Sequence, residues 1–77
     1  VTKINYDLPF DSKVLIIIYD VTGREIKRLV NNELKQGGYY TVEYNGSNLS
    51  SGVYFYRMIA EGGGKEYIMT KKMALIK

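Results

Sequence analysis

The side chains in this sequence that can carry acid–base or nucleophilic chemistry are carboxylates, lysines, tyrosines and serines, because the chain has no His, Cys or Trp. Their absence excludes imidazole bases, thiolate nucleophiles, disulfides and His/Cys metal sites. Asp7, Asp11 and Asp20 offer the oxygen ligands that hard cations prefer, but their spacing fits no EF-hand loop. We expect these carboxylates to be solvated residues of turns and strand ends, with a bound cation as the alternative.

The serines and the glycine run lack the partners that catalysis needs. Ser50 and Ser51 have no His to activate them, and Gly62-Gly63-Gly64 lacks the Lys-Ser/Thr that completes a P-loop. The sequence therefore predicts a protein that is not an enzyme and that uses no cofactor or metal.

The eight tyrosines suggest a binding alternative. Tyr39 and Tyr40 follow a glycine pair at a loop edge, where exposed aromatic rings of a β-sandwich can stack against sugar rings. A carbohydrate-binding module is therefore one alternative function. Four other tyrosines stand at alternating positions that predict burial in a core: Tyr6, Tyr44, Tyr54 and Tyr56.

The net charge of +3 is concentrated near the carboxyl end. Residues 1–60 carry seven Lys or Arg against six Asp or Glu, whereas residues 61–77 carry four Lys against two Glu. Nucleic-acid binding needs a concentrated basic face, so this small excess favours no nucleic-acid partner. With 77 residues, 45% of them hydrophobic, the chain has the size of one small globular domain.

No apolar run is long enough to cross a bilayer as a helix, since the longest covers only residues 14–19. The chain shows no signal peptide and starts at Val1 instead of Met. We therefore expect residues 1–77 to be a single domain excised from a longer protein, with any amino-terminal export signal outside this sequence.

Alternation of apolar and polar residues predicts β-strands along most of the chain. Residues 4–8, 39–44, 53–60 and 65–76 alternate, and residues 14–19 are apolar on both faces, as in the central strand of a sheet. Residues 25–35 are ambiguous because their apolar residues recur at helical spacing. Asn31-Asn32 is a poor helix interior, which favours a strand over residues 24–30 and a loop to Gly38.

These strands and the turn signals between them predict an all-β protein, an immunoglobulin-like antiparallel β-sandwich of about seven strands. The outer face of residues 14–19, with Leu15, Ile17 and Tyr19, then has to be covered by another strand layer, an attached domain or a second copy of the chain. Self-association through this face or through an exposed strand is accordingly one expectation.

Several blocks spread over the chain form a recognisable pattern. The most specific are Ser51-Gly52-Val53-Tyr54-Phe55-Tyr56 and the closing run from Lys71 to Lys77. Weaker ones are Thr2-Lys3-Ile4, Tyr6, Leu8-Pro9, Val14, Ile18-Tyr19-Asp20, Gly23, Gly37-Gly38, Asn45-Gly46 and Leu49-Ser50. Together these blocks resemble the type A C-terminal sorting domain of the type IX secretion system, over essentially the whole chain.

The resemblance implies a non-catalytic sorting signal that directs an attached cargo protein across the outer membrane. Residues 1–77 would then be a single C-terminal sorting domain of a larger exported protein. Its implied partners are the outer-membrane translocon and the processing components of that system, with the cargo domain amino-terminal in the same chain. The implied location is the periplasm in transit, then the cell surface or the medium. The family fold is an immunoglobulin-like sandwich, which favours a strand in the ambiguous segment.

The resemblance places the sorting role mainly on the last strand, and the residues concerned are Lys71, Lys72, Met73, Leu75, Lys77, Gly52 and Tyr54. For Gly52 and Tyr54 a role in building the fold is the alternative. We expect the last strand to lie at a sheet edge, where it can add to a receptor strand while its lysines supply complementary charge. The alternative is that these lysines only protect an edge from aggregation.

Some features depart from the family pattern. Tyr44-Asn45-Gly46 stands where many relatives have aromatic-Asp-Gly, Tyr40 stands where they have His, and the Pro-Asn-Pro-Phe-type segment that usually precedes Thr2 is missing. The spacing from Tyr19 to Gly23 and the Gly-x-Tyr element also resemble the immunoglobulin-like domain of flagellar hook-scaffold proteins. That resemblance implies a structural domain as the alternative function.

Overall fold

The computed structural model describes residues 2–46 and 49–76, and in these ranges it contains strands and turns but no helix. The six strands are β1 (Thr2–Leu8), β2 (Ser12–Tyr19), β3 (Glu25–Lys35), β4 (Gly38–Tyr44), β5 (Gly52–Gly62) and β6 (Lys65–Leu75). Their number among the described residues is close to the predicted seven. That part of the chain has no helix of membrane-spanning length and hydropathy.

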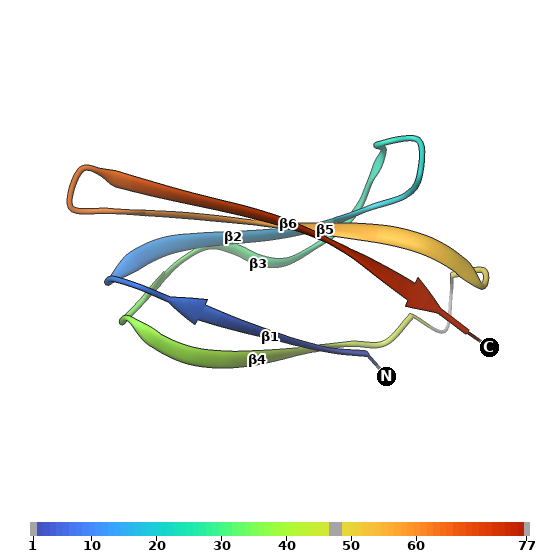
Figure 1. The fold of residues 1–77 in the computed structure, drawn as a ribbon, viewed down its shortest axis with the longest axis horizontal. Helices are drawn as coiled ribbons and strands as arrows, with labels where there is room; N and C mark the ends of the chain where they lie inside the picture. The colour runs from blue at the N-terminus through green and yellow to red at the C-terminus, as the bar shows by residue number, and fades with distance from the viewer. Residues whose placement is uncertain (1, 47–48, 77) are drawn as a thin grey trace.

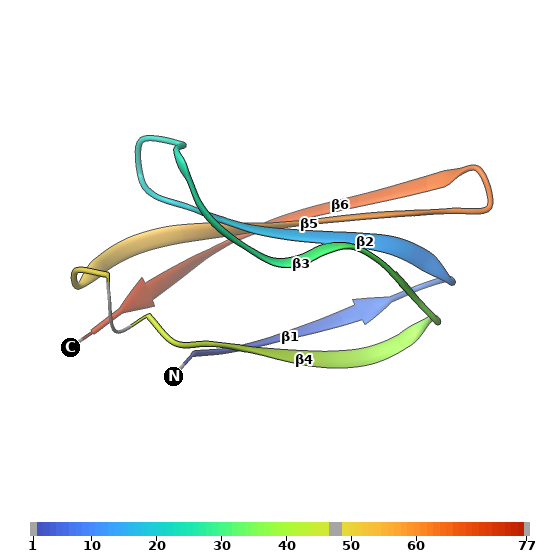
Figure 2. The ribbon, with the colours of Figure 1, turned by 180° about the vertical axis from the view of Figure 1, so that it is seen from behind.

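The strands form two antiparallel sheets that lie one above the other (Figure 1). The larger sheet has the order β3-β2-β5-β6, and the smaller one pairs β1 with β4. On the rear side of the molecule β3 descends from the larger sheet and continues into β4 in the smaller one (Figure 2). This arrangement confirms the predicted antiparallel β-sandwich.

The core lies between the sheets because alternate residues of each strand point inward. In β2 these residues are Val14, Ile16 and Ile18, all with no exposed surface, and Met58 of β5 is 1% exposed. The prediction of four core tyrosines is confirmed, since each is 9% exposed or less: Tyr6, Tyr44, Tyr54 and Tyr56. Aromatic rings therefore fill much of a core that a chain of this length can only make small.

The strand after the first turn is longer than the sequence predicts. β3 runs to Lys35 instead of ending at residue 30, so the prediction of a loop from there to Gly38 is wrong. Asn32 has a φ of 54°, and the register between β2 and β3 shifts between Val14 and Ile16. An Asn tolerates this left-handed conformation, so the pair Asn31-Asn32 produces an irregularity inside the strand and does not end it.

The outer face of β2 is partly covered by side chains of the same chain. Ile17 is 4% exposed, and its partners in the two neighbouring strands are Arg28 and Arg57. The guanidinium carbon of Arg57 lies 5.6 Å from the centre of the Tyr19 ring. Because arginine covers apolar surface with its aliphatic stem, Ile17 is buried without a further layer, so the expectation of one is wrong for this residue. Leu15 and Tyr19 are half-buried, and self-association through this face stays a prediction.

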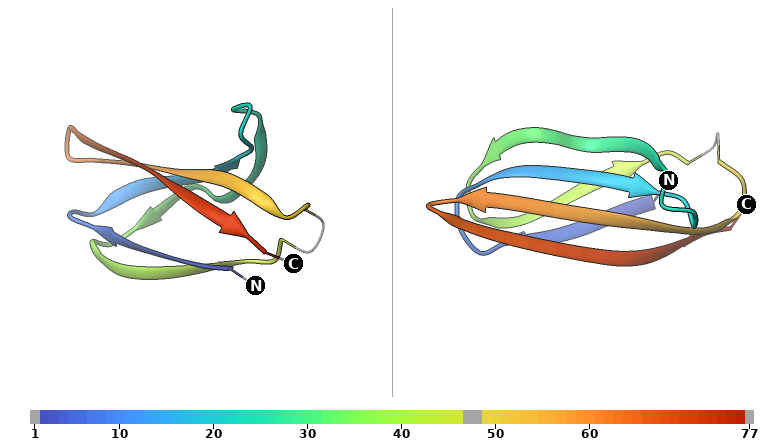
Figure 3. Two further views of the ribbon diagram at one scale, coloured as in Figure 1. Left: turned by 45° about the vertical axis from the view of Figure 1, so that its right-hand side comes forward. Right: turned by 90° about the horizontal axis from the view of Figure 1, so that it is seen from above.

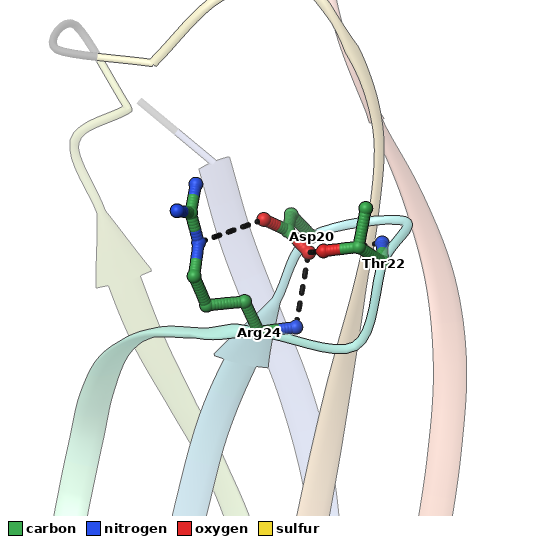
Figure 4. Close-up of polar contacts among 3 residues, drawn as sticks. All are labelled: Asp20, Thr22 and Arg24. Carbon is green, nitrogen blue, oxygen red and sulfur yellow. Dashed lines mark hydrogen bonds and ion pairs between the residues drawn. The ribbon is translucent and has the colours of Figure 1, made fainter.

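The β2–β3 turn is organised around one carboxylate (Figure 4). Asp20 Oδ1 accepts hydrogen bonds from the Thr22 amide at 2.9 Å, the Thr22 hydroxyl at 2.6 Å and the Arg24 amide at 3.0 Å, and Arg24 Nε lies 3.2 Å from Oδ2. Gly23, with a φ of 87°, adopts the left-handed conformation that closes the turn. The hydrogen bonds, above all that from the Thr22 hydroxyl, hold the pKa of Asp20 below its ordinary value of 3.8.

We expect replacement of Asp20 with Asn to remove an acid-dependent part of the stability. Because folding lowers the pKa of Asp20, its ionised form stabilises the folded state above the ordinary carboxyl pKa, and this stabilisation is lost as the pH falls through the folded pKa. Urea unfolding at about pH 7 and about pH 2.5 measures the free energy of unfolding of wild type and Asp20→Asn. The difference in this free energy between the two proteins should be smaller at the acid pH. The same difference at both pH values would contradict the role of the charge.

Candidate functional site

The last strand lies at one edge of the larger sheet, as the sequence predicts. β6 pairs with β5 in unbroken antiparallel register from Gly52↔Leu75 to Gly62↔Lys65. Among the described residues no strand pairs with its other side. One side of an 11-residue strand therefore presents backbone donors and acceptors that no neighbouring strand uses.

Lys71 and Lys72 lie on opposite faces of this sheet, since successive side chains of a strand alternate. Lys71 is paired in register with the core residue Tyr56 and therefore belongs to the inner face. Lys72 is paired with Phe55 and belongs to the outer face. Both lysines are exposed, and neither forms an ion pair with another described residue.

Met73 and Leu75 are core residues that hold the end of β6 against the smaller sheet. Each is 9% exposed, and both belong to a buried cluster that includes Ile4 and Tyr44. The burial of these two side chains gives them a structural role whatever they do in sorting. Lys77 lies outside the described residues.

The Gly-x-Tyr element lies at the start of β5, directly opposite the end of β6. Tyr54 is 9% exposed, and its hydroxyl donates a hydrogen bond to the backbone carbonyl oxygen of Ser50 at 2.7 Å. In register it is paired with Met73, while Gly52 is paired with Leu75. These contacts support the fold-building alternative for Tyr54, because its ring packs in the core and its hydroxyl fixes the preceding loop.

A groove opens between β6 and the smaller sheet. It has a volume of about 460 Å³, and three strands line it with Asn5, Tyr6, Asp7, Tyr39, Tyr40, Thr41, Tyr67, Met69 and Lys71. Of the sorting residues that the sequence singles out and the structure describes, only Lys71 lines this groove. Tyr67 and Met69 were not among them, although their odd-numbered positions on β6 show that they share the inner face with Lys71.

Two tyrosines in the groove, Tyr6 and Tyr40, contact each other. Tyr6 and Tyr40 stack with ring centres 5.4 Å apart, and Lys35 Nζ lies 5.1 Å from the centre of the Tyr40 ring. Burial raises the pKa of the Tyr6 hydroxyl above its ordinary value, and the nearby Tyr40 and Glu33 raise it further. The stacked pair therefore gives the groove an aromatic wall, beside which Asp7 and Lys71 supply one charge of each sign.

The three aspartates do not come together. Asp11 precedes β2 and Asp20 follows it, which separates them by roughly 25–30 Å along the strand. Asp11 accepts a hydrogen bond from the Gly37 amide at 2.8 Å, and Asp20 organises its own turn. No cluster of three metal-ligating side chains occurs within residues 2–46 and 49–76.

Comparison with known proteins gave one match. A family model described as "Secretion system C-terminal sorting domain" matches residues 1–75. Neither the curated proteins nor the solved structures gave a match. The matched range includes all six strands, the groove and both lysines of β6.

Proposed function

Because the chain belongs to the family of secretion system C-terminal sorting domains, we propose that it is read by an outer-membrane translocon through its last strand, β6. The family is one of sorting signals for type IX secretion and not of catalysts. Such a signal serves an attached cargo protein and directs it toward the cell surface or the medium.

The observation that carries this proposal is the edge of β6, which pairs with no further described strand and carries two lysines without an ion pair to any described residue. An exposed strand edge binds an extended segment through backbone hydrogen bonds, and the side chains on either side select the partner. Two uncompensated positive charges favour an acidic partner and speed its encounter with the domain. Recognition of this kind needs a stable fold and one accessible strand edge, and it needs no catalytic group.

The path that we propose has three steps. The cargo, amino-terminal to this domain in the same chain, reaches the periplasm with the domain attached. The translocon binds β6 and passes the cargo across the outer membrane. Processing components then leave the cargo at the cell surface or in the medium.

The test is export of a reporter protein that carries residues 1–77 at its carboxyl end, in a bacterium with type IX secretion. The variant Lys71→Glu/Lys72→Glu reverses both charges at exposed positions, so the fold should persist. We expect export to fall about tenfold or more, since the loss of about 1.4 kcal/mol in binding already gives a tenfold change.

The matched control is Lys13→Glu/Lys27→Glu, which reverses two exposed lysines on strands β2 and β3. It changes the net charge by the same amount and should leave export near the wild-type level. Equal export by all three proteins, with folding verified by circular dichroism, would refute recognition through β6. Equal losses in both variants would show that only the net charge matters.

A further inference from the structure

The two sheets differ in width, and this leaves part of β6 uncovered. Four strands face two, so the smaller sheet cannot cover every inward-facing residue of the larger one. On β5 all inward-facing side chains from Tyr54 to Ala60 are 9% exposed or less. On β6 the corresponding Tyr67 is 37% exposed and Lys71 is also exposed, although both point to the same side as the core.

The uncovered part of β6 lies on the same side of the sandwich as β1. Figure 3 shows β6 along one margin of the larger sheet, with β1 in the sheet below it. At the end of β6 the sheets close, because Met73 and Leu75 pack into the core. Toward the β5–β6 hairpin they diverge (Figure 1), and this opening is the groove lined by Tyr67, Met69 and Lys71.

The smaller sheet also has a free edge at this groove. Among the described residues β1 pairs with β4 alone, over the register from Thr2↔Tyr44 to Leu8↔Gly38. The edge of β1 offers backbone donors and acceptors that no neighbouring described strand uses, so a third strand can add there. Such a strand would lie about 4.8 Å beyond β1 and about 10 Å below β6, where its upward side chains meet those of β6.

We infer that this groove accepts one extended polypeptide segment of the export machinery, which pairs with the free edge of β1 and places a carboxylate against Lys71. This rests on the proposed function and adds a second contact to it: besides the edge of β6, the partner uses the edge of β1 beneath it and the inner face of β6. Apolar side chains of the segment would contact Met69 and Tyr67, and its acidic residue would compensate the ammonium group of Lys71. A polypeptide fits better than a saccharide because one wall of the groove is a strand edge with regularly spaced backbone groups.

The inference separates two neighbouring lysines. Lys71 acts inside the groove, whereas Lys72 lies on the outer face beside Phe55 and does not meet the segment. The same alternation separates Tyr67 from Ile68, which is 53% exposed on the outer face. Each groove residue of β6 thus has an exposed neighbour in the chain as its matched control.

The experiment places the photo-crosslinking residue p-benzoyl-L-phenylalanine at position 67 or at position 68 of the exported reporter and irradiates living cells. We expect position 67 to crosslink to an acidic segment of a translocon protein, mapped by mass spectrometry, and position 68 not to do so. In the same cells Lys71→Gln should lower export about tenfold and Lys72→Gln less than about twofold.

Each other outcome overturns the inference. Crosslinks only from position 68 would show that no segment occupies the groove. Crosslinks to a second copy of the domain, or only to a polysaccharide, would show that the groove has a different occupant. Equal effects of Lys71→Gln and Lys72→Gln on export would do the same. In all these cases a reporter that is still exported in a β6-dependent manner leaves the proposed function intact, whereas export that is independent of β6 refutes both.

Discussion

Replacement of Ile16 with Ala is expected to lower the free energy of unfolding by about 2–5 kcal/mol. Ile16 has no exposed surface and lies on β2, between Val30 of β3 and Met58 of β5. The truncation removes buried methyl groups and leaves a cavity that neighbours on three strands cannot fill. Folded domains are stable by only about 5–15 kcal/mol, and a domain this small is expected near the lower limit, so the variant should be largely unfolded at moderate temperature.

The measurement is urea unfolding followed by circular dichroism, with Ile76→Ala as the control. Ile76 is 92% exposed, so the same chemical change there should alter the stability by less than about 0.5 kcal/mol. If both variants lost the same stability, the burial of Ile16 would not explain the effect. Export of a reporter carrying Ile16→Ala should fall as well, because β6 is positioned through β5 on this core.

Replacement of Gly62 with Ala is expected to lower the free energy of unfolding by about 1–3 kcal/mol. A Cβ atom at Gly62 would overlap the backbone carbonyl oxygen of Asp11, in the turn between β1 and β2. The obstacle is backbone and not the tip of a flexible side chain, so the turn itself has to move. Such a shift would disturb the end of the sandwich where β5 passes into the β5–β6 hairpin.

The control for this change is Gly64→Asn in the same hairpin. Gly64 has a φ of 77°, which Asn tolerates better than other non-glycine residues, and a Cβ atom there meets nothing within 4 Å. Thermal unfolding should show a clearly lower midpoint for Gly62→Ala than for Gly64→Asn. A lower midpoint for Gly64→Asn would mean that backbone conformation, and not the contact with Asp11, explains the glycine run.

Much of the fold can be predicted from local patterns. The run at residues 14–19, apolar on both faces, predicts a central strand, and β2 indeed lies between β3 and β5. Gly23 and the glycine run predict the turns that follow β2 and β5. The residues after Val30 were wrongly predicted as a loop because Asn31-Asn32 has low intrinsic preference for regular structure. Pairing with β2 outweighs that preference, since Glu33, Leu34 and Lys35 each gain a partner there.

The candidate site could be predicted only in part. The closing Lys-rich run and its place at a sheet edge can be predicted from the sequence. The sequence does not distinguish the roles of Lys71 and Lys72, which stand next to each other in this run. Alternation along β6 assigns them to opposite faces, and only the pairing with β5 shows which face is inner. The groove depends on how far the smaller sheet extends beneath the larger one, a property of strand pairing between distant segments such as β1 and β4.

The sequence by itself determined that this protein is an all-β domain with no His or Cys chemistry, that most of its excess positive charge lies near the carboxyl end, and that it resembles a sorting signal. These properties depend on composition and on period-two patterns, which are local. The tertiary structure alone decided that one lysine of the final strand lines a groove while its neighbour faces outward, and that Met73 and Leu75 pack in the core beside Ile4 and Tyr44. The reason is physical: burial and the direction of a face arise only when distant strands pair, and no local pattern encodes the difference in width between two sheets.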